Sequence, residues 1–171
     1  MPTTFPRLML DHAAQRPGAP ALREKEFGIW QTLTWGALAT LVRELACGLA
    51  QAGLQRGAHI VIVGENRPRL YAAMLAAQSL GAVPVPLYQD AAAAEMVFPI
   101  TNAEVAFAIV EDQEQVDKFI ELRTLLPAES TALTHLWYDE ARGLRNYSAP
   151  GLAPLDALIA AGRAPRRTRG E

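Results

Sequence analysis

The chain has 171 residues, of which half are apolar and a fifth are charged, the composition of a globular protein with a core of its own. Sixteen basic and eighteen acidic side chains give a net charge of −2, so the overall balance excludes general attraction to nucleic acid or to an anionic membrane. The single cysteine, Cys47, excludes an internal disulfide and favours a reducing, cytoplasmic compartment.

The first elements predicted along the chain are a short helix, a β-hairpin and a long helix. The helix spans Phe5 to Gln15, and the hairpin strands are Ala21 to Arg23 and Gly28 to Leu33. Thr34 then caps the long helix, and Cys47 falls within its pattern, where a buried thiol is expected. The predicted buried stripe of this helix consists of Leu38, Leu41, Val42, Leu45 and Leu49.

The stretch from His59 to Leu87 predicts a strand, a crossover helix and a second strand. His59 to Val63 is a short β-branched run, and Asn66 is a candidate cap for the following helix, with Pro68 in its first turn. One helix face consists of Leu70, Tyr71, Met74, Leu75 and Gln78, and alanines on the other face allow close approach to a sheet. Val83 to Leu87 then continues as an extended segment.

The remaining pattern alternates helices and strands. Helices are predicted from Ala91 to Phe98, where Pro99 ends the element, from Gln113 to Leu126 with Asp112 as cap, and from Leu155 to Ala161. Strands are predicted from Val105 to Val110 and from Leu133 to Tyr138. This order indicates an α/β fold, with a mostly parallel sheet covered by helices on both faces and an opening β-hairpin. Residues 1–162 form one lobe, and residues 163–171 are expected to be a disordered tail or a truncated linker.

Three polar residues follow a predicted parallel strand at the point where open α/β sheets bind ligands. Tyr88, Gln89 and Asp90 come directly after Leu87 and are therefore candidates for ligand contact. Asp90 also has a structural alternative, because aspartate is a good N-cap for the helix that follows.

Other polar groups are assigned structural roles, and no catalytic residue or metal site is predicted. The three histidines, His12, His59 and His135, have no metal-ligand spacing. An acidic run begins a helix, where negative charge is favourable at the positive end of the dipole; it comprises Glu111, Asp112, Glu114, Asp117 and Glu121. The chain contains no Walker phosphate loop, dinucleotide fingerprint or nucleophile elbow.

Three blocks of the chain resemble one enzyme family. The sequences GENRPRLYAAMLAAQSLGAVPVPLYQDAAAAEM, AEVAFAIVEDQEQVDKFIEL and YDEARGLRNY are similar to the N-terminal region of bacterial long-chain fatty acid:CoA ligases, which are adenylate-forming enzymes of the AMP-binding superfamily. The opening segment ALREKEFGIWQTLTWGALATLVRELACGLAQAGLQRG resembles the start of the same family. The resemblance therefore covers nearly the whole chain.

The resemblance implies an incomplete N-terminal lobe of an enzyme that joins a fatty acid to coenzyme A through an acyl-adenylate, using ATP and magnesium. The family's phosphate loop, adenosine-binding motif and C-terminal lysine do not occur in this sequence, so no catalytic residue can be assigned and no cofactor is expected for this chain alone. Fatty acid, ATP and coenzyme A are the implied ligands of the full-length family. Peripheral membrane association of the parent enzyme and self-association of the fragment are left open.

Three hypotheses follow. The first is an N-terminal ligase fragment that is inactive in isolation. The second is an autonomous flavodoxin-like module that binds a ligand or partner at its sheet edge, and the third is a dimerisation fragment without catalysis. In the first hypothesis the missing body would cover apolar surface, and helices with alanine-rich second faces, such as the one from Arg67 to Leu80, are candidates to line that surface.

Overall fold

A computed structural model describes residues 3–127 and 133–164 of the chain. The elements follow one another as α1 (Phe5–Gln15), β1 (Pro20–Glu26), β2 (Ile29–Thr34), α2 (Trp35–Gln51), β3 (His59–Val63), α3 (Pro68–Ser79), β4 (Val83–Leu87), α4 (Ala93–Asn102), β5 (Phe107–Val110), α5 (Gln113–Leu125), β6 (His135–Tyr138), β7 (Leu152–Pro154) and α6 (Leu155–Arg163). Residues 165–171, most of the expected tail, lie outside the described part.

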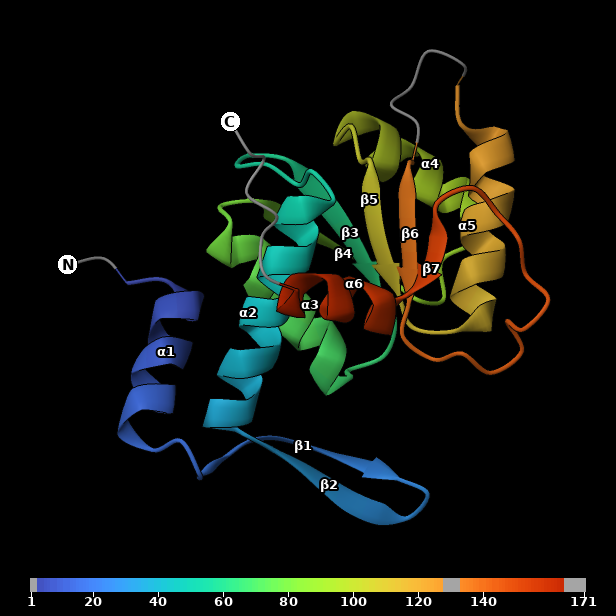
Figure 1. The fold of residues 1–171 in the computed structure, drawn as a ribbon. Helices are drawn as coiled ribbons and strands as arrows, with labels where there is room; N and C mark the ends of the chain where they lie inside the picture. The colour runs from blue at the N-terminus through green and yellow to red at the C-terminus, as the bar shows by residue number, and fades with distance from the viewer. Residues whose placement is uncertain (1–2, 128–132, 165–171) are drawn as a thin grey trace.

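The main sheet has five strands in the order β4-β3-β5-β6-β7, and every neighbouring pair is parallel. The antiparallel hairpin β1-β2 forms a separate sheet that projects beside α2 (Figure 1). The expected α/β class with a parallel sheet and an opening hairpin is therefore confirmed.

Helices cover both faces of the sheet. Strand β3 is therefore buried on both sides, and its sequence is apolar at nearly every position. Ile60 and Ile62 belong to the core beneath α1, α2, α3 and α6, whereas Val61 and Val63 belong to the core beneath α4 and α5. All four side chains are at most 2% exposed. Parallel strands that are buried on both faces contain continuous apolar runs of this kind.

Local signals in the sequence set several element boundaries. The bounds of α1, β3 and β4 are those expected from their patterns. Thr34 caps α2 by accepting a hydrogen bond from the N–H of Ala37 at 3.3 Å, and Asp112 caps α5 by accepting one from Gln115 at 3.2 Å. Both caps are confirmed, because each satisfies an amide that the helix itself leaves unpaired.

The alanine-rich face of α3 is buried, so the prediction that it forms an uncovered surface is wrong. Ala72, Ala73, Ala76 and Ala77 are fully buried in the core of this chain, whereas Tyr71 is 41% exposed. The small side chains let α3 approach the sheet and α2 closely, which is the packing role expected of alanine at such an interface.

Two expected features near α3 and α2 also differ from the structure. Arg67 occupies the N-cap position of α3 without a capping side chain, and Asn66 instead accepts a hydrogen bond from the hydroxyl of Tyr71 at 2.8 Å. Cys47 is exposed rather than buried, because it lies on the α2 face opposite the stripe that contains Leu45 and Leu49.

Helix α4 continues through Pro99 instead of ending before it. The proline removes one helical hydrogen bond, but Met96 and Ile100 are each 1% exposed and pack on the sheet from one face of the helix. Burial of this face offsets the lost bond, as tertiary packing often overrides local propensity. The helix begins after Ala92, so Asp90 is not its N-cap.

Candidate functional site

The strand carboxyl ends form one edge of the sheet, and polar residues gather there beside the hairpin. β3 leads into Gly64 to Arg67, β4 into Tyr88, β5 into Glu111 and β6 into Asp139. In a parallel sheet the carboxyl ends of all strands meet at the same edge, which is where ligands bind in open α/β folds. We call this edge the carboxyl ledge.

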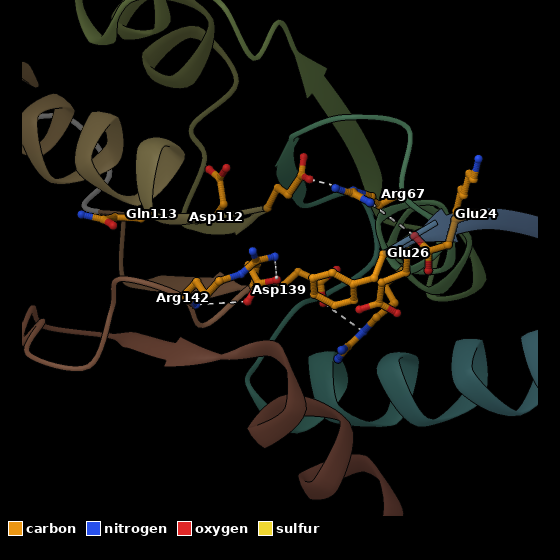
Figure 2. Close-up of a pocket in the computed structure, with 12 residues that line it drawn as sticks. Glu24, Glu26, Arg67, Asp112, Gln113, Asp139 and Arg142 are labelled. Atoms are coloured by element: carbon orange, nitrogen blue, oxygen red, sulfur yellow. Dashed lines mark hydrogen bonds and ion pairs between the residues drawn. The ribbon is translucent and has the colours of Figure 1, made fainter. Parts of the chain in front are cut away.

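Two cavities lie along the carboxyl ledge, both walled on one side by the hairpin. The first, of about 620 Å³, lies at the ends of β5 and β6 (Figure 2). The second, of about 710 Å³, lies at the ends of β3 and β4. Glu24 and Arg67 border both cavities, so their ion pair, with Arg67 Nη1 at 3.7 Å from Glu24 Oε2, lies between the two.

Arg67 and Glu111 form the central contact of the carboxyl ledge. Arg67 Nε donates to Glu111 Oε1 at 2.8 Å, while Glu111 Oε2 accepts from the backbone N–H of Glu65 at 2.5 Å. The hydrogen bond to Glu111 raises the pKa of Arg67 above its ordinary value. Glu111 is 8% exposed, so its charge is compensated in a largely dry position.

Gly64 makes this contact geometrically feasible. Its φ is +153°, and a Cβ placed there would lie 2.6 Å from both Glu111 Cβ and Leu70 Cδ1. Real Cβ atoms do not approach other atoms so closely, so only glycine lets the end of β3 lie this near the Glu111 side chain.

Arg69 also lines the first cavity and lies between two carboxylates. Its guanidinium is 3.0 Å from Asp139 Oδ1 and 2.5 Å from Asp156 Oδ1, which connects β6 to the first turn of α6. Burial raises the pKa of Asp139 to about 6, an effect that the nearby Arg69 charge partly counteracts. Asp139 Oδ1 has no hydrogen-bond donor among the described residues, because the ion pair lacks hydrogen-bond geometry.

The structure places Tyr88, Gln89 and Asp90 together on the wall of the second cavity. Tyr88 is 79% exposed and available to contact a ligand. The carbonyl of Gln89 instead anchors the turn to α5, because it accepts from Lys118 Nζ at 2.5 Å and from Gln115 Nε2 at 3.2 Å. A role in ligand contact for these three residues stays a prediction.

The members of the acidic run that begins at Glu111 make different kinds of contact. Asp112 caps α5, Glu114 pairs with Lys118 at 2.8 Å, and Asp117 accepts from the hydroxyl of Tyr147 at 2.7 Å, all structural roles. Glu111 itself holds two strand ends together, a function that no local pattern indicated. Its partner lies 44 residues away in the sequence, so no spacing rule could have identified it.

Within residues 3–127 and 133–164, no group of three or more metal-ligating side chains is suited to a metal ion. Two of the three histidines have aromatic neighbours: His12 lies against Trp35, and His135 stacks on Phe107 and on Trp137, whose rings also stack on each other. In the same part of the chain, no helix combines the length and apolar character that crossing a membrane requires.

Comparison with known proteins gives a consistent set of similarities. The model of the family described as AMP-binding enzyme matches residues 9–158. The uncharacterized protein Rv1549 of Mycobacterium tuberculosis is 34% identical over 117 residues, which cover 68% of this chain and 65% of that protein. The long-chain-fatty-acid–CoA ligase ACSBG2 of Mus musculus is 30% identical over 119 residues, which cover 70% of this chain and 18% of the ligase.

Solved structures share the fold. The acetoacetyl-CoA synthetase of Streptomyces lividans superposes with a TM-score of 0.77 and 24% identity over 91% of this chain, which is 24% of that protein. The N-terminal domain of FACL13 from Mycobacterium tuberculosis superposes with a TM-score of 0.71 and 18% identity over 97% of this chain and 37% of that domain. The chain therefore spans a minor part of these larger proteins.

Proposed function

The chain belongs to the AMP-binding enzyme family, and from this premise we propose that it forms the first part of the adenylate-forming domain of a long-chain fatty acid:CoA ligase. The observation that supports this most directly is the family match over residues 9–158, together with 30% identity to a long-chain-fatty-acid–CoA ligase. The full-length reaction activates a fatty acid with ATP and magnesium and then transfers the acyl group to coenzyme A.

In this proposal the chain supplies scaffold rather than chemistry. Its parallel sheet presents the carboxyl ledge, and the contacts of Arg67 with Glu111 and of Arg69 with Asp139 fix the relative positions of three strand ends. Rigid positioning of this kind is what a fold contributes to a site that other segments complete.

The first cavity does not suit a nucleoside triphosphate. Among the described residues, six carboxylates line it against four cations, and the cations Arg67, Arg69 and Arg142 are each paired with a carboxylate. A triphosphate needs an excess of donors and positive charge, as a phosphate loop or helix N-terminus provides. We therefore assign the binding of ATP, magnesium and coenzyme A to parts of the enzyme beyond this lobe, and we propose that the lobe alone is inactive.

The turn after β4 is the part of this lobe that we propose to contact a ligand of the complete enzyme. Tyr88 is exposed on the second cavity with Gln89 and Asp90, at the end of a strand in a parallel sheet. We also place the protein in the cytoplasm, which the exposed, unpaired thiol of Cys47 supports.

A chimera tests the proposal. The matching segment of mouse ACSBG2 is replaced by this chain, and fatty-acid-dependent exchange of pyrophosphate into ATP is measured together with thioester formation. In a control chimera the segment comes from the Streptomyces lividans acetoacetyl-CoA synthetase. We expect long-chain acyl-CoA synthesis only with this chain. A soluble but inactive chimera would favour an autonomous binding module or a dimerisation unit instead.

A further inference from the structure

In the part of the chain that the structure describes, the two sheets have four outer strand edges, and three of them are protected against pairing with another strand. Exposed edges present unpaired N–H and C=O groups, and proteins block them with prolines, charges or short strands. The main sheet ends at β4 on one side and at β7 on the other, and the hairpin has one free edge on β1 and one on β2.

Prolines protect the edge of β4. The N–H of Val83 donates to the carbonyl of Ala58 beside β3, so the alternation of the strand turns positions 84 and 86 away from β3. Both positions are prolines, which have no N–H to donate. An added strand would therefore find no donors along this edge.

The edges of β7 and β1 are protected by other means. β7 has three residues and ends at Pro154, too short for a stable ladder. β1 contains four consecutive charged residues, Arg23 to Glu26, which disfavour an added strand.

Strand β2 has none of these protections. Its sequence, IWQTLT, contains no charge and no proline and consists mainly of β-branched, aromatic and aliphatic residues. Ile29 and Trp30 are 65% and 62% exposed. Figure 1 shows β2 on the side of the hairpin away from the main sheet, and the first four residues of β2 are exposed.

The hairpin turn defines which groups of β2 point outward. Phe27 and Gly28 have φ values of +47° and +81°, and Glu26 pairs with Ile29 across this two-residue turn. In such a hairpin the residues that flank the turn share hydrogen bonds, and the next pair faces outward. Trp30 and Thr32 therefore point their N–H and C=O groups to the free edge, and no hydrogen bond within the described chain uses them.

We infer that β2 pairs antiparallel with β2 of a second copy of this chain, which joins two hairpins into one four-stranded sheet. An uncharged strand meets its own copy without like-charge repulsion. The charged β1 strands then form both outer edges, so assembly stops at a two-fold dimer rather than continuing as a fibre.

Matched proline substitutions test the inference. Thr32→Pro removes an outward N–H from the β2 edge, and Arg23→Pro removes the corresponding N–H from the β1 edge. Both variants lose the same hydrogen bond, from Arg23 Nε to Thr32 Oγ1, so they differ mainly in which edge they block. Trp30→Lys is a second variant that adds charge to β2 and leaves its backbone donors in place.

Analytical ultracentrifugation of the full chain across a concentration series is the measurement. We expect a species of twice 18.6 kDa whose dissociation constant rises at least about tenfold in Thr32→Pro and Trp30→Lys but not in Arg23→Pro. Thermal melts establish that each variant is folded. A wild-type chain that stays monomeric, or a dimer that neither β2 variant weakens, would overturn the inference. Because no ligase activity is measured, the result is independent of the proposed function.

Discussion

Arg67 and Glu111 lie 44 residues apart in the sequence, yet the guanidinium Nε of one donates to the carboxylate of the other across 2.8 Å. This contact connects the end of β3 to the end of β5, and a second ion pair of Arg67 extends it to Glu24 in the hairpin. The carboxyl ledge and both of its cavities depend on this arrangement.

Removal of the Glu111 carboxylate should destabilise the fold. Glu111→Ala leaves the Glu65 amide and the Arg67 guanidinium without their acceptor, and we expect a loss of about 2 kcal/mol in the free energy of unfolding, because Arg67 is partly solvated. Glu114→Ala, at an exposed pair within one helix, is the control and should change stability by less than about 0.5 kcal/mol. Equal effects in urea titrations would contradict a special role for Glu111.

Asp139 should make stability depend on pH. Its pKa of about 6 in the folded protein exceeds its ordinary value of 3.8. Between these two pH values the native state therefore keeps a proton on Asp139 that the unfolded state has released. The associated stability is present below about pH 4 and is lost as the pH rises through 6. Asp139→Asn, which imitates the protonated form, should therefore stabilise the protein by about 1–3 kcal/mol at pH 7.5 and by little at pH 4. The measurement is the free energy of unfolding of variant and wild type at pH 4 and at pH 7.5. The same difference between the two proteins at both pH values would contradict the prediction.

Gly162 should be intolerant of any side chain. A Cβ there would collide with the carbonyl of Glu44, and Gly48 of α2 lies against Leu158 in the same way, so α2 and α6 are in backbone contact. Gly162→Ala should cost about 1–3 kcal/mol through forced separation of the helices. The control is Gly18→Ala, where a Cβ meets no atom within 4 Å and the change should be neutral or slightly stabilising. Similar melting temperatures for the two variants would show that α6 is free to move away.

Two leucines of the α2 stripe should respond differently to truncation. Leu45 is fully buried in the core, so Leu45→Ala should lower the free energy of unfolding by roughly 2–5 kcal/mol through loss of contacts and formation of a cavity. Leu41 packs at the margin of the same core and is only partly buried, so Leu41→Ala should cost clearly less. A loss below about 0.5 kcal/mol for Leu45→Ala, the range of surface sites, would contradict the buried face.

The isolated chain should not bind Mg-ATP tightly. Among the residues that the structure describes, those lining the first cavity include more carboxylates than cations, and most of these cations are already paired. Isothermal titration should therefore show no micromolar site, which would correspond to about −8 kcal/mol of binding free energy. Detection of such a site would contradict the assignment of ATP binding to other parts of the enzyme.

Local sequence patterns predicted much of the fold correctly. The apolar run His59 to Val63 defined β3, and the hydroxyl of Thr34 and the carboxylate of Asp112 defined two helix starts. These features depend on side-chain periodicity and on hydrogen bonds within one turn of backbone, so the sequence alone contains them. The position of Tyr88 at the sheet edge followed in the same way from the parallel topology.

Other features depended on partners that are distant in the sequence. Pro99 remains inside α4 because Met96 and Ile100 are buried on the sheet, and the alanines of α3 are buried because α2 and the sheet cover them. The pairing of Glu111 with Arg67 likewise requires two strand ends to meet. The sequence by itself determined most of the elements, though not β7, and the caps at Thr34 and Asp112, since these depend on local side-chain patterns. Only the tertiary structure decided the strand order, which faces are covered and which charges pair, since all three depend on distances between segments far apart in the chain.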